Sequence, residues 1–417
     1  MTKQPDDFEP RPYALKNKIQ NYAWGTAGEK AFIPKFLNEK IEPNTPYAEL
    51  WIGAHPSAPS EVRIDDFYIP LNRMIEQYPK QILGAEIAAK FDNKLPFLFK
   101  VLSAAEALSI QAHPNKIQAV KLHQKDPKHY PDDNHKPEVA VALDSLTALV
   151  GFKSVAELKQ VMIDYPELVD YLGQESLEVL NNSHNINISG ESSIIKNIYT
   201  KLMSNSITHE RELARALTSL EKRLLNSTVK LTEGERFFLK LKEKYGTDVG
   251  LFSIFILKMI HLKTGEGLFL SAGIPHAYLK GNIVECMANS DNVVRAGLTP
   301  KFKDVKTLLN ILRYDPSQVK IFKPDVRQQK FIYEAGVPEF RLTRCTFPKN
   351  YEYNHENVNR PSVYLITDGE LLVQWQKDGQ VRHQQFYKGQ SFLIPACLNR
   401  FKISAISNGV YFTVELP

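Results

Sequence analysis

The sequence predicts a mainly β protein with a helical insertion. Three patterns along its 417 residues indicate this fold class. The first third has short apolar runs joined by Pro and Gly, the middle has apolar residues at helical spacing, and strand-like alternation returns afterwards. Two jelly rolls, the first split by a helical domain, account for this order. The expected regions are residues 1–150 and 251–325 for a first, catalytic jelly roll, 151–250 for the helical insertion, and 326–417 for a second jelly roll.

Helix signals begin directly after residue 150. Ser154 and Glu157 form a capping-box pattern, which satisfies free backbone N–H groups in the first turn of a helix. Thr232 opens a later helix, and Gly246 is placed to end it. The region also contains an apolar stripe at helical spacing, formed by Leu213, Leu217, Leu220 and Leu224. Such stripes predict core packing within the insertion.

Strand signals lie on both sides of the insertion. Phe97–Leu102 is a largely apolar run with the length of a buried strand, and Leu268–Leu270 runs into a turn at Gly273. A short helix is expected over Val305–Leu312. Alternation in the last region, as in Ser362–Ile366, predicts the strands of the second jelly roll.

The composition is that of an ordinary globular enzyme. With 43% hydrophobic and 24% charged residues, the chain can bury a large core and is neither disordered nor fibrous. The net charge of +5 is small, and the Lys and Arg residues are scattered, which argues against a nucleic-acid partner. No run approaches 18 apolar residues, so no membrane span is expected.

The cysteines and the first residues predict a cytoplasmic protein. Cys286, Cys345 and Cys397 are far apart and form no Cys-x-x-Cys pair, which is typical of reduced thiols. The first seven residues lack the apolar segment of a secretory signal. We expect a monomer, because neither a heptad pattern nor an exposed apolar strand indicates a partner.

Four polar side chains stand out as candidate metal ligands. Gln111 and His113 are two residues apart, so on a strand both side chains face the same way. Glu138 and His276 would have to come from other strands of the same sheet. Two imidazoles, a carboxylate and an amide oxygen suit zinc, with a position left for water or substrate. Spacing alone leaves the alternative open that the histidines are ordinary core residues.

Longer motifs identify a family. The chain closely resembles the type I mannose-6-phosphate isomerases, which are zinc enzymes of the cupin superfamily. The resemblance runs from about residue 12 to the C-terminus and is densest before residue 150 and in 268–305. It is carried by the segments QNYAWG (20–25), YAELWIGAHPSAPS (47–60), LPFLFKVLSAAEALSIQAHPNK (95–116), DNHKPE (133–138) and GNIVECMANSDNVVRAGLTPKFKDV (281–305).

The resemblance implies a fold, a cofactor and a reaction. The fold would be two cupin-type jelly-roll domains plus an α-helical domain. One zinc ion per chain would be held by Gln111, His113, Glu138 and His276. The reaction would interconvert mannose 6-phosphate and fructose 6-phosphate through a cis-enediol(ate), and would feed GDP-mannose synthesis or mannose catabolism. The second jelly roll is expected to hold no metal.

The resemblance also implies catalytic residues. Arg295 lies in the segment that matches the family's active-site arginine, and a guanidinium that is always charged would steady the enediolate or orient the substrate. Glu285 is a candidate proton shuttle, with a structural ion pair as the alternative. Lys301 and Lys136 would carry a proton if burial lowered the pKa of either, or would bind an anion.

No P-loop is present for a phosphate group. The fold analogy places Ser109, Lys100 and Lys136 on neighbouring strands, so these three residues are expected to hold the phosphate. Ser109 lies two residues before Gln111 and would share its strand face. Trp24 is expected to wall the cavity, with packing as the alternative role.

Two other classes of protein compete with an isomerase. A metal-dependent cupin oxygenase would use a similar barrel, but usually with iron held by several histidines. A sugar-binding cupin without catalytic activity would need neither the Arg295 segment nor a complete ligand set. Both are present, so the sequence favours the isomerase.

Overall fold

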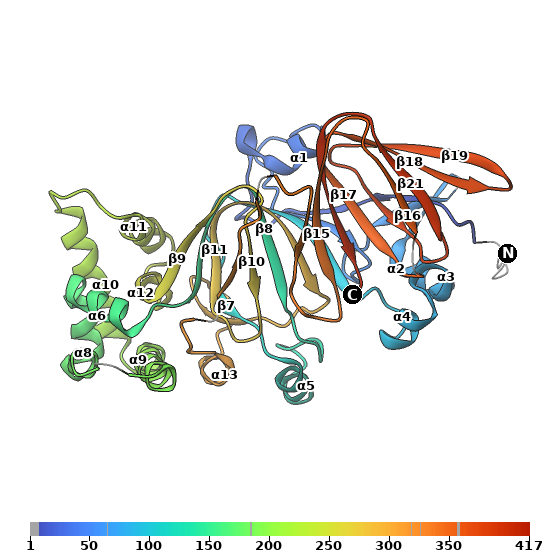
Figure 1. Ribbon diagram of the computed structural model, residues 1–417. Coiled ribbons are helices and arrows are strands. Elements are labelled where there is room, and N and C mark those ends of the chain that lie inside the picture. The colour runs from blue at the N-terminus through green and yellow to red at the C-terminus, as the bar shows by residue number, and fades with distance from the viewer. Residues whose placement is uncertain (1–7, 65, 184–185, 318, 326, 357–358) are drawn as a thin grey trace.

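The computed structural model describes residues 8–417 apart from 65, 184–185, 318, 326 and 357–358 (Figure 1). Antiparallel sheets form most of the structure, and thirteen α-helices lie among the described residues. No described helix is long and apolar enough to cross a membrane. Figure 1 shows most helices of the middle region at one end, a large sheet in the centre and the C-terminal strands on the other side.

The central sheet has ten strands and carries the candidate ligands. Its main path pairs β13, β10, β8, β11, β6, β3 and β2, while β7, β12 and β9 attach beside β11 and β8. The bounds are β2 (Lys18–Gln20), β3 (Glu49–Gly53), β6 (Phe97–Ala104), β7 (Ile110–Ala112), β8 (Glu138–Phe152), β9 (Leu257–Leu262), β10 (Gly267–Leu270), β11 (His276–Ala288), β12 (Val294–Gly297) and β13 (Lys320–Phe322).

Two further sheets contain the C-terminal strands. An eight-stranded sheet runs in the order β14, β15, β22, β17, β20, β1, β4, β5, and a four-stranded sheet in the order β16, β21, β18, β19. The bounds are β1 (Tyr13–Lys16), β4 (Glu61–Ile64), β5 (Phe67–Pro70), β14 (Lys330–Tyr333), β15 (Arg341–Phe347), β16 (Glu352–Glu356), β17 (Ser362–Asp368), β18 (Glu370–Lys377), β19 (Gln380–Tyr387), β20 (Ser391–Ile394), β21 (Arg400–Ala405) and β22 (Gly409–Glu415).

Most helices belong to one layer beside the central sheet. Helices α6 to α12 follow one another between β8 and β9, and their apolar faces share one core with β7 and β12. The bounds are α1 (Phe32–Leu37), α2 (Leu71–Gln77), α3 (Pro79–Leu83), α4 (Ala85–Lys90), α5 (Lys116–Lys125), α6 (Val155–Asp164), α7 (Pro166–Leu172), α8 (Gln174–Asn181), α9 (Ile188–Thr208), α10 (Glu210–Leu225), α11 (Glu233–Tyr245), α12 (Gly250–Ile256) and α13 (Val305–Ile311).

The helix signals read from the sequence are confirmed. Ser154 and Thr232 cap α6 and α11 with complete capping boxes, and Gly246 follows α11 with a positive φ of 61°. The four predicted leucines of the 213–224 stripe are all buried on α10. Amphipathic spacing and caps are local signals, which is why they could be read without the tertiary structure.

Two predicted boundaries differ from the structure. Strand β1, inside the expected catalytic region 1–150, pairs with β20 of the C-terminal region, and β4 and β5 extend that same sheet. Sequence patterns indicate a strand but not its distant partner, so this exchange was not predictable. Helix α12 continues to Ile256, beyond the expected end at 250. The sequence did not signal this helix, because all seven of its residues are buried and they show no amphipathic period.

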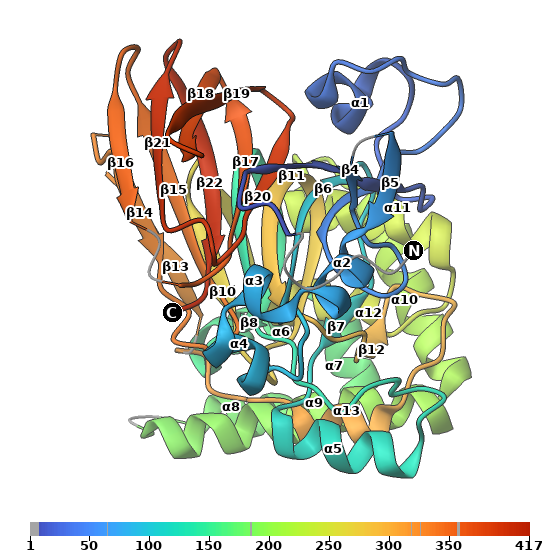
Figure 2. The ribbon, with the colours of Figure 1, turned by 90° about the vertical axis from the view of Figure 1, so that its right-hand side faces the viewer.

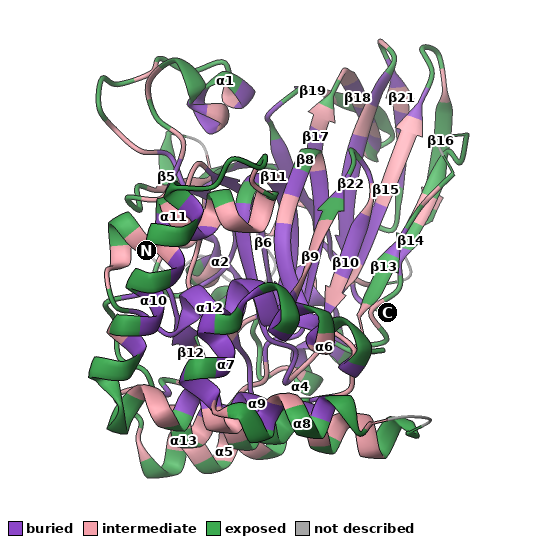
Figure 3. Cartoon of the chain, turned by 90° about the vertical axis from the view of Figure 1, so that its left-hand side faces the viewer, coloured by how far each residue is buried: buried purple, intermediate pink, exposed green. Residues whose placement is uncertain are grey.

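The two larger sheets share one hydrophobic core. Residues of β3, β6, β8 and β11 pack in the same cluster as residues of β1, β15, β17 and β22. Figures 2 and 3 show the central strands β6, β8 and β11 between the C-terminal strands and the helical layer, with β6 and β11 largely buried. The candidate ligands therefore lie on the most enclosed sheet of the molecule.

Candidate metal centre and active-site pocket

Three neighbouring strands bring the candidate metal ligands together. His113 directly follows β7, Glu138 is the first residue of β8, and His276 is the first residue of β11. Strand β11 pairs with both of the others, and His276 lies opposite Gln111 in the register. Gln111 and His276, which are 165 positions apart in the sequence, are therefore neighbours in one sheet, as predicted.

The imidazoles and the carboxylate converge on one point. His113 Nε2 lies 3.5 Å from Glu138 Oε1, and His276 Nε2 lies 3.4 Å from Glu138 Oε2. All three residues are at most 2% exposed. Among the described residues, they are the one group of three His, Cys, Asp or Glu side chains placed to hold a metal ion.

Unpaired atoms at this point fit a divalent cation. His113 Nε2 and Glu138 Oε2 are buried and have no hydrogen-bond partner. Buried polar atoms without partners are rare, because leaving one unpaired costs roughly 1–3 kcal/mol. A zinc ion accepts imidazole nitrogens and carboxylate oxygens as ligands, so the residues present fit it.

Gln111 lies beside these three side chains. Its Nε2 is 3.4 Å from His276 Nε2. The oxygen and nitrogen of an amide are interchangeable by a flip about its last torsion, so either atom can face the centre. With the oxygen turned inward, Gln111 completes the predicted set of four ligands.

The second ring nitrogen of each histidine is held by the backbone. His113 Nδ1 donates to the carbonyl of Asn292 at 2.8 Å, and His276 Nδ1 donates to the carbonyl of Ile274 at 3.0 Å. A carbonyl can only accept, so the proton sits on Nδ1 and the lone pair of Nε2 faces the centre. Ligating histidines are commonly oriented in this way.

Asn292 itself is held by a polar network that sequence reasoning missed. Its Nδ2 donates to Asp132 and to the carbonyl of Asn134, while Asp132 accepts from Ser290 Oγ and from the backbone N–H of Asp291. The network ties the segment before Glu138 to the one before Arg295. The polar run 289–292 between two strands was the available signal.

Electrostatics keep the ligand groups in the forms that bind a metal. Burial lowers the pKa of His113, which favours the neutral imidazole. Burial raises the pKa of Glu138, but the nearby positive charge of Lys136 opposes this effect, and the net pKa lies well below its usual range. Lys136 contributes directly, since its Nζ lies 3.4 Å from Glu138 Oε1.

A cavity of about 910 Å³ opens beside the ligands. Nine of the predicted site residues line it, whereas His113 and His276 lie behind its surface. Lys244 and Tyr245 at the end of α11 and Thr247 and Asp248 after it also line the cavity, so the helical region forms part of its wall. The nine are Trp24, Lys100, Ser109, Gln111, Lys136, Glu138, Glu285, Arg295 and Lys301.

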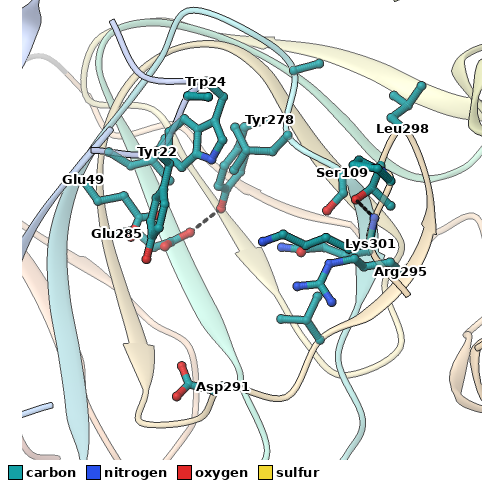
Figure 4. A pocket seen from close by; sticks show the side chains of 18 of the residues that line it. Tyr22, Trp24, Glu49, Ser109, Tyr278, Glu285, Asp291, Arg295, Leu298 and Lys301 are labelled. Atoms are coloured by element: carbon teal, nitrogen blue, oxygen red, sulfur yellow. Dashed lines mark hydrogen bonds between the residues drawn. The ribbon is translucent and has the colours of Figure 1, made fainter. Parts of the chain in front are cut away.

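One side of the pocket carries a buried charge cluster (Figure 4). Lys100 Nζ lies 2.7 Å from Glu285 Oε2 and 3.8 Å from Glu49 Oε1. The hydroxyl of Tyr278 donates to Glu285 Oε1 at 2.7 Å. Burial disfavours the ammonium of Lys100, but the two carboxylates raise its pKa above the ordinary value. Burial, followed by the charge of Glu285, raises the pKa of Tyr278 well above its usual value.

The expected phosphate role of Lys100 stays a prediction, and this cluster makes it less favourable. Its charge is already balanced by two carboxylates, so it offers no free positive charge to an anion. The register explains the pairing, because Lys100 on β6 lies directly opposite Glu285 on β11, and Trp51, two residues beyond Glu49, lies opposite Lys100 on the other side. Sequence reasoning singled out both Lys100 and Glu285 but could not see that they neutralise each other.

The other side of the pocket carries free cations (Figure 4). Arg295 is partly buried, burial lowers its pKa, and it makes no ion pair with any residue the structure describes. The acidic residues nearest to it in the sequence have other partners, since Asp291 faces His55 and Asp304 caps α13. Ser109 and Lys301 lie on this side, and Lys301 is exposed.

Trp24 lies at the wall on the cluster side. Its ring stacks on Tyr22 at a centroid distance of 5.8 Å, and both residues line the cavity. The backbone carbonyl of Trp24 also accepts from the N–H groups of residues 105 and 106. Trp24 therefore has both the packing and the wall positions that the sequence left as alternatives.

Comparisons with known proteins identify the family of this chain. The family model "Phosphomannose isomerase type I, catalytic domain" matches residues 13–155. Mannose-6-phosphate isomerase of Rattus norvegicus is 39% identical over 385 residues, which is 87% of this chain and 89% of that protein. The chain belongs to the phosphomannose isomerase family. It is therefore an enzyme of that family, and the family resemblance read from the sequence is confirmed.

Further members of the family support the assignment. Mannose-6-phosphate isomerase 2 of Arabidopsis thaliana is 38% identical over 375 residues, covering 85% of this chain and 83% of that protein. Phosphomannose isomerase of Salmonella typhimurium has a similar fold, with a TM-score of 0.84 at 28% identity over 97% of this chain and 99% of that one. A mannose 6-phosphate isomerase solved with zinc and yttrium gives a TM-score of 0.83 at 29% identity, again over 97% and 99%.

Proposed function

We propose that the protein interconverts mannose 6-phosphate and fructose 6-phosphate with one bound zinc ion per chain. The observation that carries the proposal is a buried His-Glu-His group with unpaired ligand atoms beside a pocket that is also lined by Arg295 and Lys301, which form no ion pair with any residue that the structure describes. Membership of the phosphomannose isomerase family supports the choice of substrate. We also propose that the two large sheets correspond to the two cupin-type jelly rolls.

The reaction requires a proton to move between C1 and C2 of the sugar. We propose a cis-enediol(ate) intermediate, whose oxygens become negatively charged. Zinc held by Gln111, His113, Glu138 and His276 would supply a Lewis acid for those oxygens. The backbone carbonyls behind the two histidines keep both rings oriented toward that point.

Two buried groups are proposed to carry the proton. Lys136 lies 3.4 Å from the ligand Glu138 and lines the pocket. Glu285 also lines the pocket, where Lys100 and the hydroxyl of Tyr278 hold its carboxylate in place. Lys301 is exposed, so it lacks the burial that a proton-carrying lysine needs, and we assign it to anion binding instead.

We propose that the phosphate binds at the side with free cations. Arg295 and Lys301 supply positive charge there, and Ser109 supplies a hydroxyl donor. A guanidinium without a carboxylate partner is well suited to a phosphate or to enediolate oxygens, because its planar donors pair with two oxygens at once. Lys136 is kept near the reacting carbons by Glu138, and Lys100 is neutralised by its own carboxylates.

We further propose a cytoplasmic monomer that acts on a small sugar phosphate, without nucleic acid or membrane as partners. The small and scattered net positive charge supports this. The product would enter GDP-mannose synthesis or mannose catabolism.

A coupled assay of mannose 6-phosphate conversion to fructose 6-phosphate tests the function. We expect activity in the purified protein, loss of activity after chelation, and recovery when zinc is added back. His113→Ala, prepared in parallel, should not recover with zinc. Oxygen uptake with Fe(II) should be absent, since uptake would indicate an oxygenase. A zinc-loaded wild type without isomerase activity would refute the proposal.

A further inference from the structure

A buried carboxylate outside the charge cluster fixes the segment that carries the pocket's free lysine. Asp248 lies between α11 and α12, lines the pocket and is 5% exposed. Its Oδ1 accepts from the backbone N–H groups of Gly250 and Leu298, each at 2.8 Å. Its Oδ2 lies 3.0 Å from Lys303 Nζ. One side chain thus joins the helical layer to the segment that follows β12.

The backbone at this junction is strained. Leu298 has a φ of +54°, in the left-handed region that a non-glycine residue without a polar side chain rarely adopts. Such a conformation is unfavourable for a residue with a side chain and persists only where the surroundings enforce it. The hydrogen bond from its N–H to Asp248 is the direct means of enforcing it.

The segment after β12 and the start of α12 also touch backbone to backbone. A Cβ added at Gly297 would lie 2.6 Å from the N and Cα atoms of Gly250, and one added at Gly250 would lie 2.8 Å from the N atom of Leu298. Neither position has room for a side chain. Close packing and the Asp248 hydrogen bonds therefore hold the same peptide, that between residues 297 and 298.

The residues on either side of this peptide face the pocket. Arg295 precedes it on β12, and Lys301 follows it after a turn in which the Lys301 N–H donates to Thr299 Oγ1. Figure 4 shows Leu298, Lys301, Arg295 and Ser109 on the same side of the pocket. A shift of the 297–298 peptide would move Lys301 relative to Ser109, which belongs to a different strand connection.

We propose that Asp248 is a positioning residue for the phosphate end of the pocket. By holding Leu298 in its left-handed conformation, it sets the direction in which the chain enters the Lys301 turn. This inference rests on the proposed function insofar as Lys301 and Arg295 bind the substrate's phosphate. It assigns Asp248 no contact with the reacting carbons or with the metal.

Electrostatics and positioning predict opposite effects when Asp248 is replaced. Removing a carboxylate near two cations should by itself strengthen the binding of an anion. Removing the hydrogen bonds that Asp248 accepts from Gly250 and Leu298 should weaken anion binding, because a small misplacement of a binding group can lower affinity by up to roughly 100-fold. The sign of the change therefore separates the two explanations.

The test compares Asp248→Ala with Asp248→Asn. Asn keeps an oxygen that can accept from both N–H groups but loses the charge and the acceptor for Lys303, whereas Ala removes all of these. The probe is inorganic phosphate, measured by titration calorimetry and as an inhibitor of isomerisation. We expect Asp248→Ala to bind phosphate roughly 10–100-fold more weakly and to raise the KM for mannose 6-phosphate in parallel, with zinc content unchanged. Asp248→Asn should bind phosphate as well as the wild type or better.

Two further variants control for folding. Glu167→Gln changes another buried carboxylate of the helical layer, one that pairs with the partly exposed Arg223, and should leave phosphate binding and KM unchanged. Gly297→Ala pushes the same peptide away from Gly250 without changing any charge, so it should weaken phosphate binding as Asp248→Ala does, even if the latter fails to fold.

Three results would overturn the inference. These are phosphate binding by folded Asp248→Ala at wild-type strength or tighter, equal weakening in Asp248→Asn, or the same loss in Glu167→Gln. A failure of the proposed function gives a different result, namely a zinc-loaded wild type that binds phosphate but does not convert the sugar. Phosphate calorimetry would then still test whether Asp248 positions the Lys301 turn.

Discussion

Each histidine at the candidate metal centre bonds the backbone through one ring nitrogen and directs the other at Glu138. His113 and His276 both donate from Nδ1 to backbone carbonyls, which leaves Nε2 directed at Glu138. Packing alone would not orient two rings toward one carboxylate in this way. The arrangement therefore favours a ligand role over that of ordinary core histidines.

Removal of one ligand tests the metal assignment. We expect His276→Ala to lose the zinc that the wild type retains after dialysis, because the remaining ligands leave an incomplete site. Elemental analysis of zinc per chain is the measurement. His261→Ala, on the exposed face of β9, is the control and should retain one zinc. Equal zinc contents in the two variants would contradict the assignment.

A second prediction at the residue scale concerns the role of Arg295, which has no carboxylate partner among the described residues and is not one of the proposed metal ligands. If it stabilises charge on the reacting substrate, Arg295→Ala should lower turnover by roughly 10²–10³-fold. Arg295→Lys should recover only part of this, since an ammonium lacks the planar fork. Zinc content and melting temperature should hardly change.

Turnover per folded, zinc-loaded molecule separates the two roles of Arg295. A structural arginine would give the reverse pattern, in which stability falls and the folded fraction turns over normally. Normal turnover by that measure would end the catalytic interpretation.

At the scale of single elements, β16 contains a histidine that links stability to pH. His355 stacks on Phe401 of β21 at a centroid distance of 4.5 Å, and its Nε2 is buried without a partner. Burial, with a smaller effect from Lys330, lowers the pKa of His355 to about 4. The folded state therefore binds this proton less readily than the unfolded state does.

The sign of the pH effect follows from that difference. The stabilising contribution is complete above the unfolded pKa of about 6.5 and is lost as the pH falls toward 4, because only the unfolded chain gains the proton in that window. The loss between pH 7 and pH 4 can reach about 3 kcal/mol. We expect His355→Phe to reduce this pH dependence, as judged from urea midpoints across the range. The exposed His383→Phe should keep the wild-type dependence.

At the scale of the whole molecule, the two larger sheets are joined through one core. Leu365 of the C-terminal strand β17 belongs to the same cluster as Phe99 of β6, which lies one residue from Lys100. The strand exchange at β1 adds a second connection, because the chain passes through the C-terminal sheet before entering the central one. We therefore expect the C-terminal region to stabilise the metal centre without contributing a ligand.

Leu365→Ala tests this coupling. Truncation of a fully buried leucine costs roughly 2–5 kcal/mol. We expect zinc release and loss of circular dichroism to shift together to lower urea concentration. Leu225→Ala, which truncates an exposed leucine at the end of α10, should shift neither. Zinc release that stays at the wild-type midpoint while the C-terminal sheet unfolds earlier would show that the two sheets are independent.

The sequence by itself determined the local features of this protein. Caps at Ser154 and Thr232, the apolar stripe of α10 and the i, i+2 pair at Gln111 and His113 all depend on neighbouring residues, so their pattern is visible in one dimension. Motif resemblance extended this to the four metal ligands and to Arg295. These assignments rest on the resemblance and stay predictions.

Only the tertiary structure decided which of these residues face one another. Lys100 was expected to bind phosphate, but strand register places it opposite Glu285 and neutralises it. Asp248 lies in no recognisable sequence motif. In the structure it nevertheless accepts hydrogen bonds from the backbone N–H groups of Gly250 and Leu298, which lie about 50 residues apart. Charge balance and backbone strain depend on distances between strands and loops, and a sequence specifies those distances only through the complete packed fold.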